Sequence, residues 1–189
     1  LPHYMDNNFT IMPFKKKHIS EVALIHFKEL QIGFLNYFGL QFLEKMYSLL
    51  LEKNWGFVVI SKTDNKVLGF IVATQKEQSL LHCLSVNSLF SFFMSVIKDI
   101  KKLKEFVIAV HKLYLTKKIS RPTKNRLELS HFSVKKGFKG KKLGSHLIMK
   151  LEQKAKTMKY DTIFSKTHNV SLMSFYQRSR QARLLNTTP

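Results

Sequence analysis

Residues 134–147 read VKKGFKGKKLGSHL, and this stretch decides how the chain is organised. A β-type run ends at Val134, and a stripe of apolar residues with helical spacing begins at Leu143. The turn between them, residues 135–142, holds two glycines and five lysines. The first amides of a helix have no internal partner and carry partial positive charge, so this arrangement favours phosphate binding. A solvated basic turn without a ligand is the alternative interpretation.

Apolar spacing on both sides of this stretch predicts a mixed α/β order. Strands are expected at 9–12, 55–60, 67–73, 126–134 and 160–165, and helices at 19–30, 42–51, 141–158 and 169–178. Residues 63–66 predict the turn of an antiparallel hairpin. Residues 79–117 predict one or two helices. The offset between Leu127 and Leu129 on one side and Phe132 and Val134 on the other predicts a β-bulge near Ser130.

Bulk properties fit one globular domain that covers residues 1–189. The chain has 189 residues, 44% of them hydrophobic, which excludes a disordered composition. The formal net charge of +20 attracts anions of many kinds. The one cysteine, Cys83, excludes an intrachain disulfide and favours a cytoplasmic setting. No transmembrane segment, signal-peptide layout or zinc-type cluster is evident, so no metal and no membrane are expected.

Three features accompany the basic turn: the strand sequence Val67-Leu68-Gly69-Phe70-Ile71, then Asn169, then Phe175-Tyr176. Together they resemble the GNAT superfamily of acetyl-CoA-dependent N-acetyltransferases over roughly Phe9 to Tyr176. Residues 139–144, KGKKLG, match that family's Gln/Arg-x-x-Gly-x-Gly/Ala loop, whose amides hold the CoA pyrophosphate. The implied fold is a mixed, mostly antiparallel sheet with helices on both faces.

Two departures from the family pattern stand out. The family usually has glycine where this chain has Lys142. After Tyr176 the remaining residues, 177–189, do not show the family's last strand pair. Missing strands would leave a sheet edge that a second subunit could cover, so a homodimer is one expectation.

The resemblance implies acetyl-CoA as cosubstrate and no metal. The backbone amides of the strand would bind the acetyl oxygen and the pantetheine arm, the turn would bind the diphosphate, and Asn169 would contact the arm. The cofactor-binding residues so expected are Phe132, Val134, Lys139, Gly140, Lys141, Lys142, Leu143, Gly144, Ser145 and Asn169. Asn169 also fits an N-cap of the following helix.

The resemblance also assigns the acid–base chemistry. Glu128 lies where some members carry the general base, and His131 on the same strand is its substitute. Tyr176 matches the usual general acid for the CoA sulfur. The structural alternatives are a surface carboxylate for Glu128, a polar strand residue for His131 and a packed helix aromatic for Tyr176.

The implied activity is transfer of an acetyl group from acetyl-CoA to a primary amine. The acceptor would be a protein amine or a small molecule, including an amino sugar carried on a nucleotide. Its site would be formed by residues 27–47 and 79–117. The alternative function is a non-catalytic basic module that binds nucleic acid or another polyanion.

Overall fold

A computed structural model of the chain describes residues 8–30, 34–53, 55–74 and 125–165, with six single positions between 87 and 108. The elements follow in the order strand, two helices, three strands, helix and strand. Their bounds are β1 (Phe9–Pro13), α1 (Ile19–Glu29), α2 (Leu40–Lys53), β2 (Trp55–Ser61), β3 (Val67–Thr74), β4 (Arg126–Val134), α5 (Leu143–Thr157) and β5 (Thr162–Phe164), with short 3-10 helices η1 (Lys16–His18), η2 (Phe34–Phe38) and η4 (Lys136–Phe138).

The five strands form one sheet in the order β1-β2-β3-β4-β5. The first four pair antiparallel, and the tight turn between Ser61 and Val67 makes β2 and β3 the predicted hairpin. β5 pairs parallel with β4, since α5 carries the chain back to the starting end of the sheet. The mixed α/β class with a mostly antiparallel sheet is therefore confirmed.

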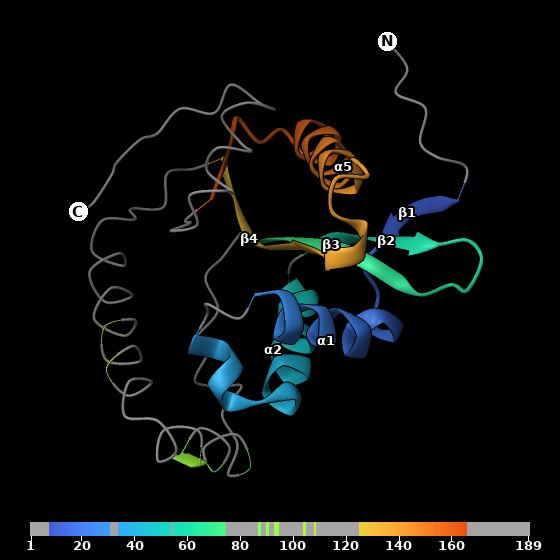
Figure 1. Cartoon of the computed structure of the whole chain (residues 1–189). Coiled ribbons are helices and arrows are strands. Elements are labelled where there is room, and N and C mark those ends of the chain that lie inside the picture. The colour runs from blue at the N-terminus through green and yellow to red at the C-terminus, as the bar shows by residue number, and fades with distance from the viewer. Residues whose placement is uncertain are drawn as a thin grey trace.

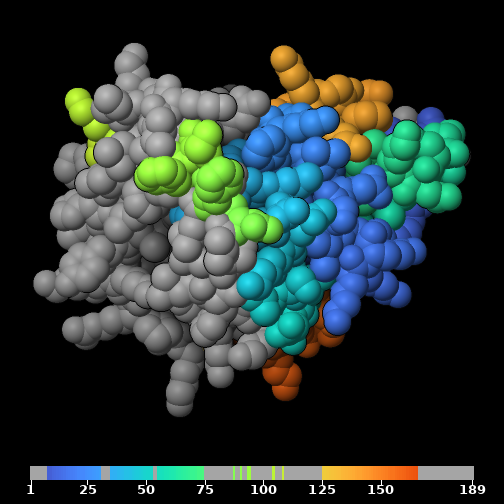
Figure 2. Space-filling view, turned by 90° about the horizontal axis from the view of Figure 1, so that it is seen from below, coloured from blue at the N-terminus to red at the C-terminus, as the bar shows by residue number. Residues whose placement is uncertain are grey.

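Helices cover both faces of the sheet (Figure 1). On one face α1 and α2 pack over a core that includes Leu43, Tyr47 and Phe70. Figure 2, seen from below, shows blue and cyan atoms of this part of the chain at the surface on that side. On the other face α5 buries Leu143, Leu147, Leu151 and Ala155 against the sheet. The apolar stripes of the helices thus each meet one face of the same sheet.

Three predictions on and after α5 differ from the structure. The helix begins at Leu143 instead of Lys141, because Lys142 has a φ of 59° and cannot continue a right-handed helix. The predicted stripe ended with Met158, which is exposed because α5 ends at Thr157 and the chain turns through Lys159 at positive φ. The strand predicted at 160–165 is limited to Thr162–Phe164.

Several predictions fall outside the described residues. These are the helix at 169–178, the absent last strand pair, and most of the helical region at 79–117. Within that region the six described positions are helical and exposed: Asn87, Phe90, Phe93, Met94, Lys104 and Ile108.

Candidate active site

The site is built where β4 bulges and then turns into α5. Val72 of β3 pairs with His131 and the next residue, Ala73, pairs with Leu129, so Ser130 is the extra residue of a bulge in β4. The hydroxyls of Ser130 and Thr74 are 2.5 Å apart and join the bulge to β3. The predicted bulge is confirmed, and it explains the offset in the apolar pattern. Leu127, Leu129, Phe132 and Val134 all contact the α5-side core.

The bulge lies where β4 and β5 stop pairing. The parallel register covers only Arg126, Leu127 and Glu128 of β4. One residue later the Ser165 hydroxyl donates to the Leu129 carbonyl at 3.2 Å. Among the described residues no strand pairs with this side of β4 beyond that point.

The backbone of β4 after the bulge alternates between its two sides. The amide of Lys135 donates to the Leu68 carbonyl of β3 at 2.8 Å. Because successive residues of a strand direct their backbone groups to opposite sides, the amides of Val134 and Phe132 point away from β3, toward the β5 side. These are the two amides that were expected to bind the acetyl oxygen and the pantetheine arm.

The turn from β4 into α5 has an irregular backbone that presents amides. Gly140 has a φ of 84° and Lys142 a φ of 59°, both in the left-handed region. This conformation explains why glycine is usual at the position of Lys142, since only glycine adopts it without strain. Lys142 nevertheless adopts it.

The amides at the start of α5 point out of the helix end. The first helical hydrogen bond runs from the His146 amide to the Lys142 carbonyl at 3.1 Å, and the His146 ring also contacts that carbonyl at 2.9 Å. The amides of Leu143 and Gly144 precede this bond and so have no partner within the helix. With the dipole of a 15-residue helix behind them, they suit an anionic group.

Lysine side chains surround these amides. Lys139, Lys141 and Lys142 are all exposed. The Lys139 ammonium lies 3.0 Å from Glu29, and that of Lys141 lies 5.0 Å from the centre of the Phe138 ring. Backbone N–H donors combined with ammonium groups fit a diphosphate, which has acceptors and negative charge only. The residues of the turn therefore fit the diphosphate of CoA.

Close packing holds the turn against β4. A Cβ atom added to Gly144 would lie 2.9 Å from Cζ of Phe132. The first turn of α5 therefore packs directly on the Phe132 ring, which would have to shift to admit a side chain at this position. Gly144 thus places the helix amides next to the strand amides of the same site.

The candidate bases share the opposite face of β4. Glu128, Ser130 and His131 are not among the β4 residues that pack toward α5. The ring of His131 instead lies 5.6 Å from the ring of Tyr47 in α2. Glu128 is half-buried, beside the last paired residue of β5. The two base candidates are thus brought to one face, the one that α1 and α2 cover.

A cluster of titratable rings surrounds His131 and was not predicted from the sequence. Tyr47 Oη lies 2.7 Å from Nδ1 of His26, and the rings of His26 and His131 are 5.4 Å apart. Burial, and secondarily the charge of His131, lowers the pKa of His26 to about 3. Burial lowers the pKa of His131 to about 4 and raises the pKa of Tyr47 well above its usual value. All three groups are therefore neutral at neutral pH.

The His131 ring has an unsatisfied atom. Its Nδ1 is buried and has no hydrogen-bond partner among the described residues. His26 and Tyr47 fall on the apolar stripes of their helices, and both are buried. The only sequence signal for the cluster was that His26 and Tyr47, which carry polar rings, occupy positions on the apolar stripes of α1 and α2.

Two expected site residues, Asn169 and Tyr176, lie outside the described residues. The part of the chain that the structure describes contains no group of three His, Cys, Asp or Glu side chains that could hold a metal ion. None of its helices is long and apolar enough to cross a membrane.

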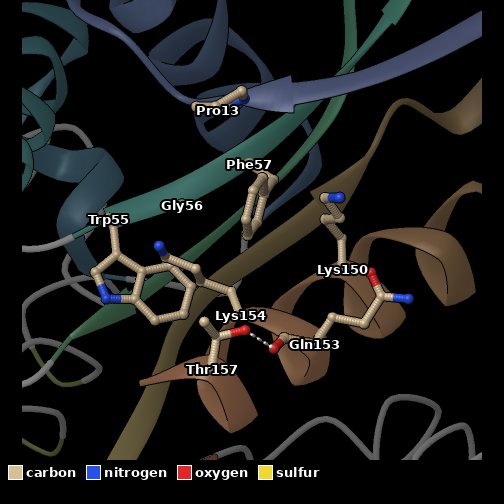
Figure 3. A pocket seen from close by; sticks show the side chains of 8 residues that line it. All are labelled: Pro13, Trp55, Gly56, Phe57, Lys150, Gln153, Lys154 and Thr157. Atoms are coloured by element: carbon tan, nitrogen blue, oxygen red, sulfur yellow. Dashed lines mark hydrogen bonds between the residues drawn. The ribbon is translucent and has the colours of Figure 1, made fainter.

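A separate hollow of about 430 Å³ lies between β2 and the later turns of α5 (Figure 3). The indole nitrogen of Trp55 is buried there without a partner among the described residues, and Lys150 and Lys154 stand on the helix side. The hollow is lined by Pro13, Trp55, Gly56, Phe57, Lys150, Gln153, Lys154 and Thr157. None of these belongs to the bulge or to the basic turn.

Comparison with known proteins identifies the fold and the family. Residues 27–180 match the family model described as the acetyltransferase (GNAT) family. No curated protein matches the chain significantly.

Several solved structures share the fold. A CoA complex of an aminoglycoside N-acetyltransferase has a TM-score of 0.60 at 12% identity, covering all of this chain and 95% of that one. An aminoglycoside acetyltransferase from an uncultured soil metagenomic sample has a TM-score of 0.58 at 12% identity, covering 98% and 96%. Glucosamine-6-phosphate N-acetyltransferase from Arabidopsis thaliana has a TM-score of 0.58 at 11% identity, covering 97% of both chains.

Proposed function

The chain belongs to the GNAT family of acetyltransferases and is an acetyl-CoA-dependent N-acetyltransferase, and we propose that its acceptor is the primary amine of a small molecule, an amino sugar. One observation supports this site above all. The bulge at Ser130 occurs where β4 and β5 stop pairing, and the basic turn follows on the same strand. A cosubstrate with a diphosphate at one end and a reactive acyl group at the other would span these two features.

In this proposal the diphosphate of CoA binds the turn and the first turn of α5. The amides of Leu143 and Gly144 donate to its oxygens, and Lys139, Lys141 and Lys142 supply charge. The amides of Phe132 and Val134 receive the pantetheine arm and the acetyl oxygen, with Asn169 contacting the arm. The bound cosubstrate supplies the activated acetyl group, and the strand amides stabilise negative charge on its oxygen.

Acetyl transfer requires that the amine be neutral when it attacks. We assign proton removal to Glu128, because it is a half-buried carboxylate on the same face of β4 as His131, two residues before the bulge. His131 is the second candidate, because its ring is neutral at neutral pH and its Nδ1 has no partner among the described residues. As the carbon–sulfur bond breaks, the thiolate takes a proton, which we assign to the phenol of Tyr176.

The choice of an amino sugar is supported by the structural neighbours. The three described above are named as acetyltransferases of aminoglycosides or of glucosamine 6-phosphate. The net charge of +20 suits an acceptor that carries phosphate, such as a nucleotide-linked amino sugar. A single domain over residues 1–189, a cytoplasmic setting and a homodimer remain predictions.

A thermal-shift titration at physiological salt tests the cosubstrate. Binding to the folded state raises the apparent stability by mass action. We expect saturable shifts with acetyl-CoA and CoA but not with ATP. Equal shifts with all three would show only a basic surface, and loss of unrelated DNA binding with added salt would then support the polyanion alternative.

A thiol-release assay over a panel of amines then tests the acceptor and the base. We expect turnover with amino sugars, and a loss of about 10²-fold or more in kcat for Glu128→Gln with an unchanged KM for acetyl-CoA. An equal loss in His131→Gln alone would move the base role to His131. Acetylation of peptides alone would overturn the small-molecule proposal.

A further inference from the structure

Glu29 at the end of α1 reaches the turn between β4 and α5. Its Oε1 accepts a hydrogen bond of 2.9 Å from the amide of Lys136, and its Oε2 lies 3.0 Å from the ammonium of Lys139. The Glu29 side chain is 15% exposed, and that of Lys139 is 57% exposed. The partly buried carboxylate of Glu29 at the end of α1 thus contacts the turn that would bind the diphosphate. Glu29 and Lys136 are 107 positions apart in the chain.

The Glu29 carboxylate is ionised at neutral pH. Burial alone would raise its pKa, but the hydrogen bond from the Lys136 amide and the pairing with Lys139 outweigh burial and leave the pKa below its usual value. Repulsion between a fixed negative charge and a diphosphate would weaken CoA binding, unless the carboxylate also had a favourable effect on the site. Its contacts show two effects, which are to hold the backbone of η4 and to pair with Lys139.

A second carboxylate of α1 offers a comparison. Glu21, two turns earlier, accepts a 2.8 Å hydrogen bond from the amide of Val67 at the start of β3. Both residues therefore accept from a backbone amide outside α1, Glu21 from β3 and Glu29 from η4. Only Glu29 ties it to the basic turn, so only Glu29 can affect the shape of that turn directly.

We propose that Glu29 is a positioning residue for CoA, which fixes the turn after β4 through the Lys136 amide and so links α1 to the diphosphate site. This inference rests on the proposed function. The bond to Lys136 anchors η4, from which the left-handed residues Gly140 and Lys142 lead into the amides of α5. Without the anchor, the amides would have to be ordered by the ligand, which lowers its affinity.

Two substitutions separate the reach of the side chain from its charge. Glu29→Gln keeps the length and an oxygen that accepts from the Lys136 amide, but it removes the charge. Glu29→Asp keeps the charge but is one methylene shorter, so it cannot hold the same bond without backbone movement. We expect Glu29→Asp to raise the Kd for CoA about tenfold, and Glu29→Gln to change it less than about threefold.

Glu21→Asp is the matched control, because it shortens the other carboxylate of the same helix. We expect it to lower Tm as Glu29→Asp does while the Kd for CoA, measured by calorimetry, stays at the wild-type value. In turnover, Glu29→Asp should raise KM for acetyl-CoA more than it lowers kcat. A general loss of folding would affect both variants alike.

The outcomes distinguish this proposal from the proposed function. If the wild-type protein does not bind CoA, the proposed site itself is wrong. If the wild-type protein binds CoA and Glu29→Asp binds it equally well, the positioning role alone is overturned. If Glu29→Gln loses affinity and Glu29→Asp does not, charge matters and the backbone anchor does not, which also contradicts the proposal.

Discussion

At the scale of single residues, Lys142 adopts a backbone conformation that suits glycine. Its φ of 59° places Cβ close to the following carbonyl, at a cost of about 1–2 kcal/mol. Glycine would remove that cost but would lose about 0.5–1 kcal/mol of its own freedom on folding. The strain exceeds this loss of freedom, so the lysine should carry a net penalty.

We therefore predict that Lys142→Gly raises the free energy of unfolding by about 0.5–1 kcal/mol. Urea denaturation followed by circular dichroism measures this difference. Lys141→Gly is the control, because it removes the same charge from a neighbour whose φ is not positive, and it should destabilise. A drop of similar size in both variants would show that the left-handed conformation at Lys142 carries no strain.

At the scale of elements, the contact between α5 and β4 depends on the absence of a side chain at Gly144. A Cβ there would lie 2.9 Å from the Phe132 ring, so either the ring or the first turn of α5 would have to shift. A shift of α5 would move the helix amides relative to the strand amides of the site. A side chain at position 144 should consequently weaken both the packing of α5 on β4 and the binding of the cosubstrate.

We predict that Gly144→Val lowers the free energy of unfolding by about 1–3 kcal/mol, the usual cost of overpacking, and weakens CoA binding. Gly137→Val in the same turn is the control, since a Cβ there meets no atom within 4 Å. Its effect should stay within about 0.5 kcal/mol. Chemical denaturation and CoA titration of both variants test this, and equal stabilities would contradict the close approach.

The β4–turn–α5 unit was predictable because its signals are local. The apolar pattern of β4 shifts by one residue at Ser130, and a bulge is the simple explanation. The apolar stripe of α5 and its preceding glycine lie within a few residues of each other. Local signals did not predict the start of α5. The residue in the left-handed conformation before it is Lys142 and not a glycine, so the sequence does not mark the end of the turn.

The tertiary ties of the site were not predictable from local pattern. The contact from Glu29 to Lys136 joins residues 107 positions apart, and a glutamate at a helix end is usually solvated. The burial of His26 and Tyr47 follows from their stripe positions, but their 2.7 Å contact depends on how α1 crosses α2. Such crossings are set by the packing of many side chains, which one sequence does not specify.

At the scale of the whole molecule, the buried His26 and the half-buried His131, whose rings contact each other, make stability depend on pH. The pKa values of His26 and His131 are about 3 and about 4 in the folded state, against 6.5 for an unperturbed imidazole. Between these values the unfolded chain binds protons that the folded chain does not. With respect to these two groups, the free energy of unfolding is highest above about pH 6.5 and falls as the pH is lowered toward 4.

We predict a slope of about 1.4 kcal/mol per pH unit for each such proton in this range, measured by urea denaturation at several pH values. His131→Phe removes one titrating ring from the ring cluster and should reduce the slope by about one proton. It also removes a buried nitrogen that has no partner among the described residues, so stability near pH 5 should rise. An unchanged slope would show that His131 already titrates normally when folded.

The bulge at Ser130 also limits how this chain can change length. Both faces of the sheet carry packed cores, so removing a residue of β4 outside the bulge would send some of the strand's apolar side chains to the wrong core. Removing Ser130 itself would instead leave a regular strand with Leu127, Leu129, Phe132 and Val134 still on one face. Relatives of this protein should therefore lose a residue inside β4 only at the bulge, and such a gap would mark a strand without the local kink of this site.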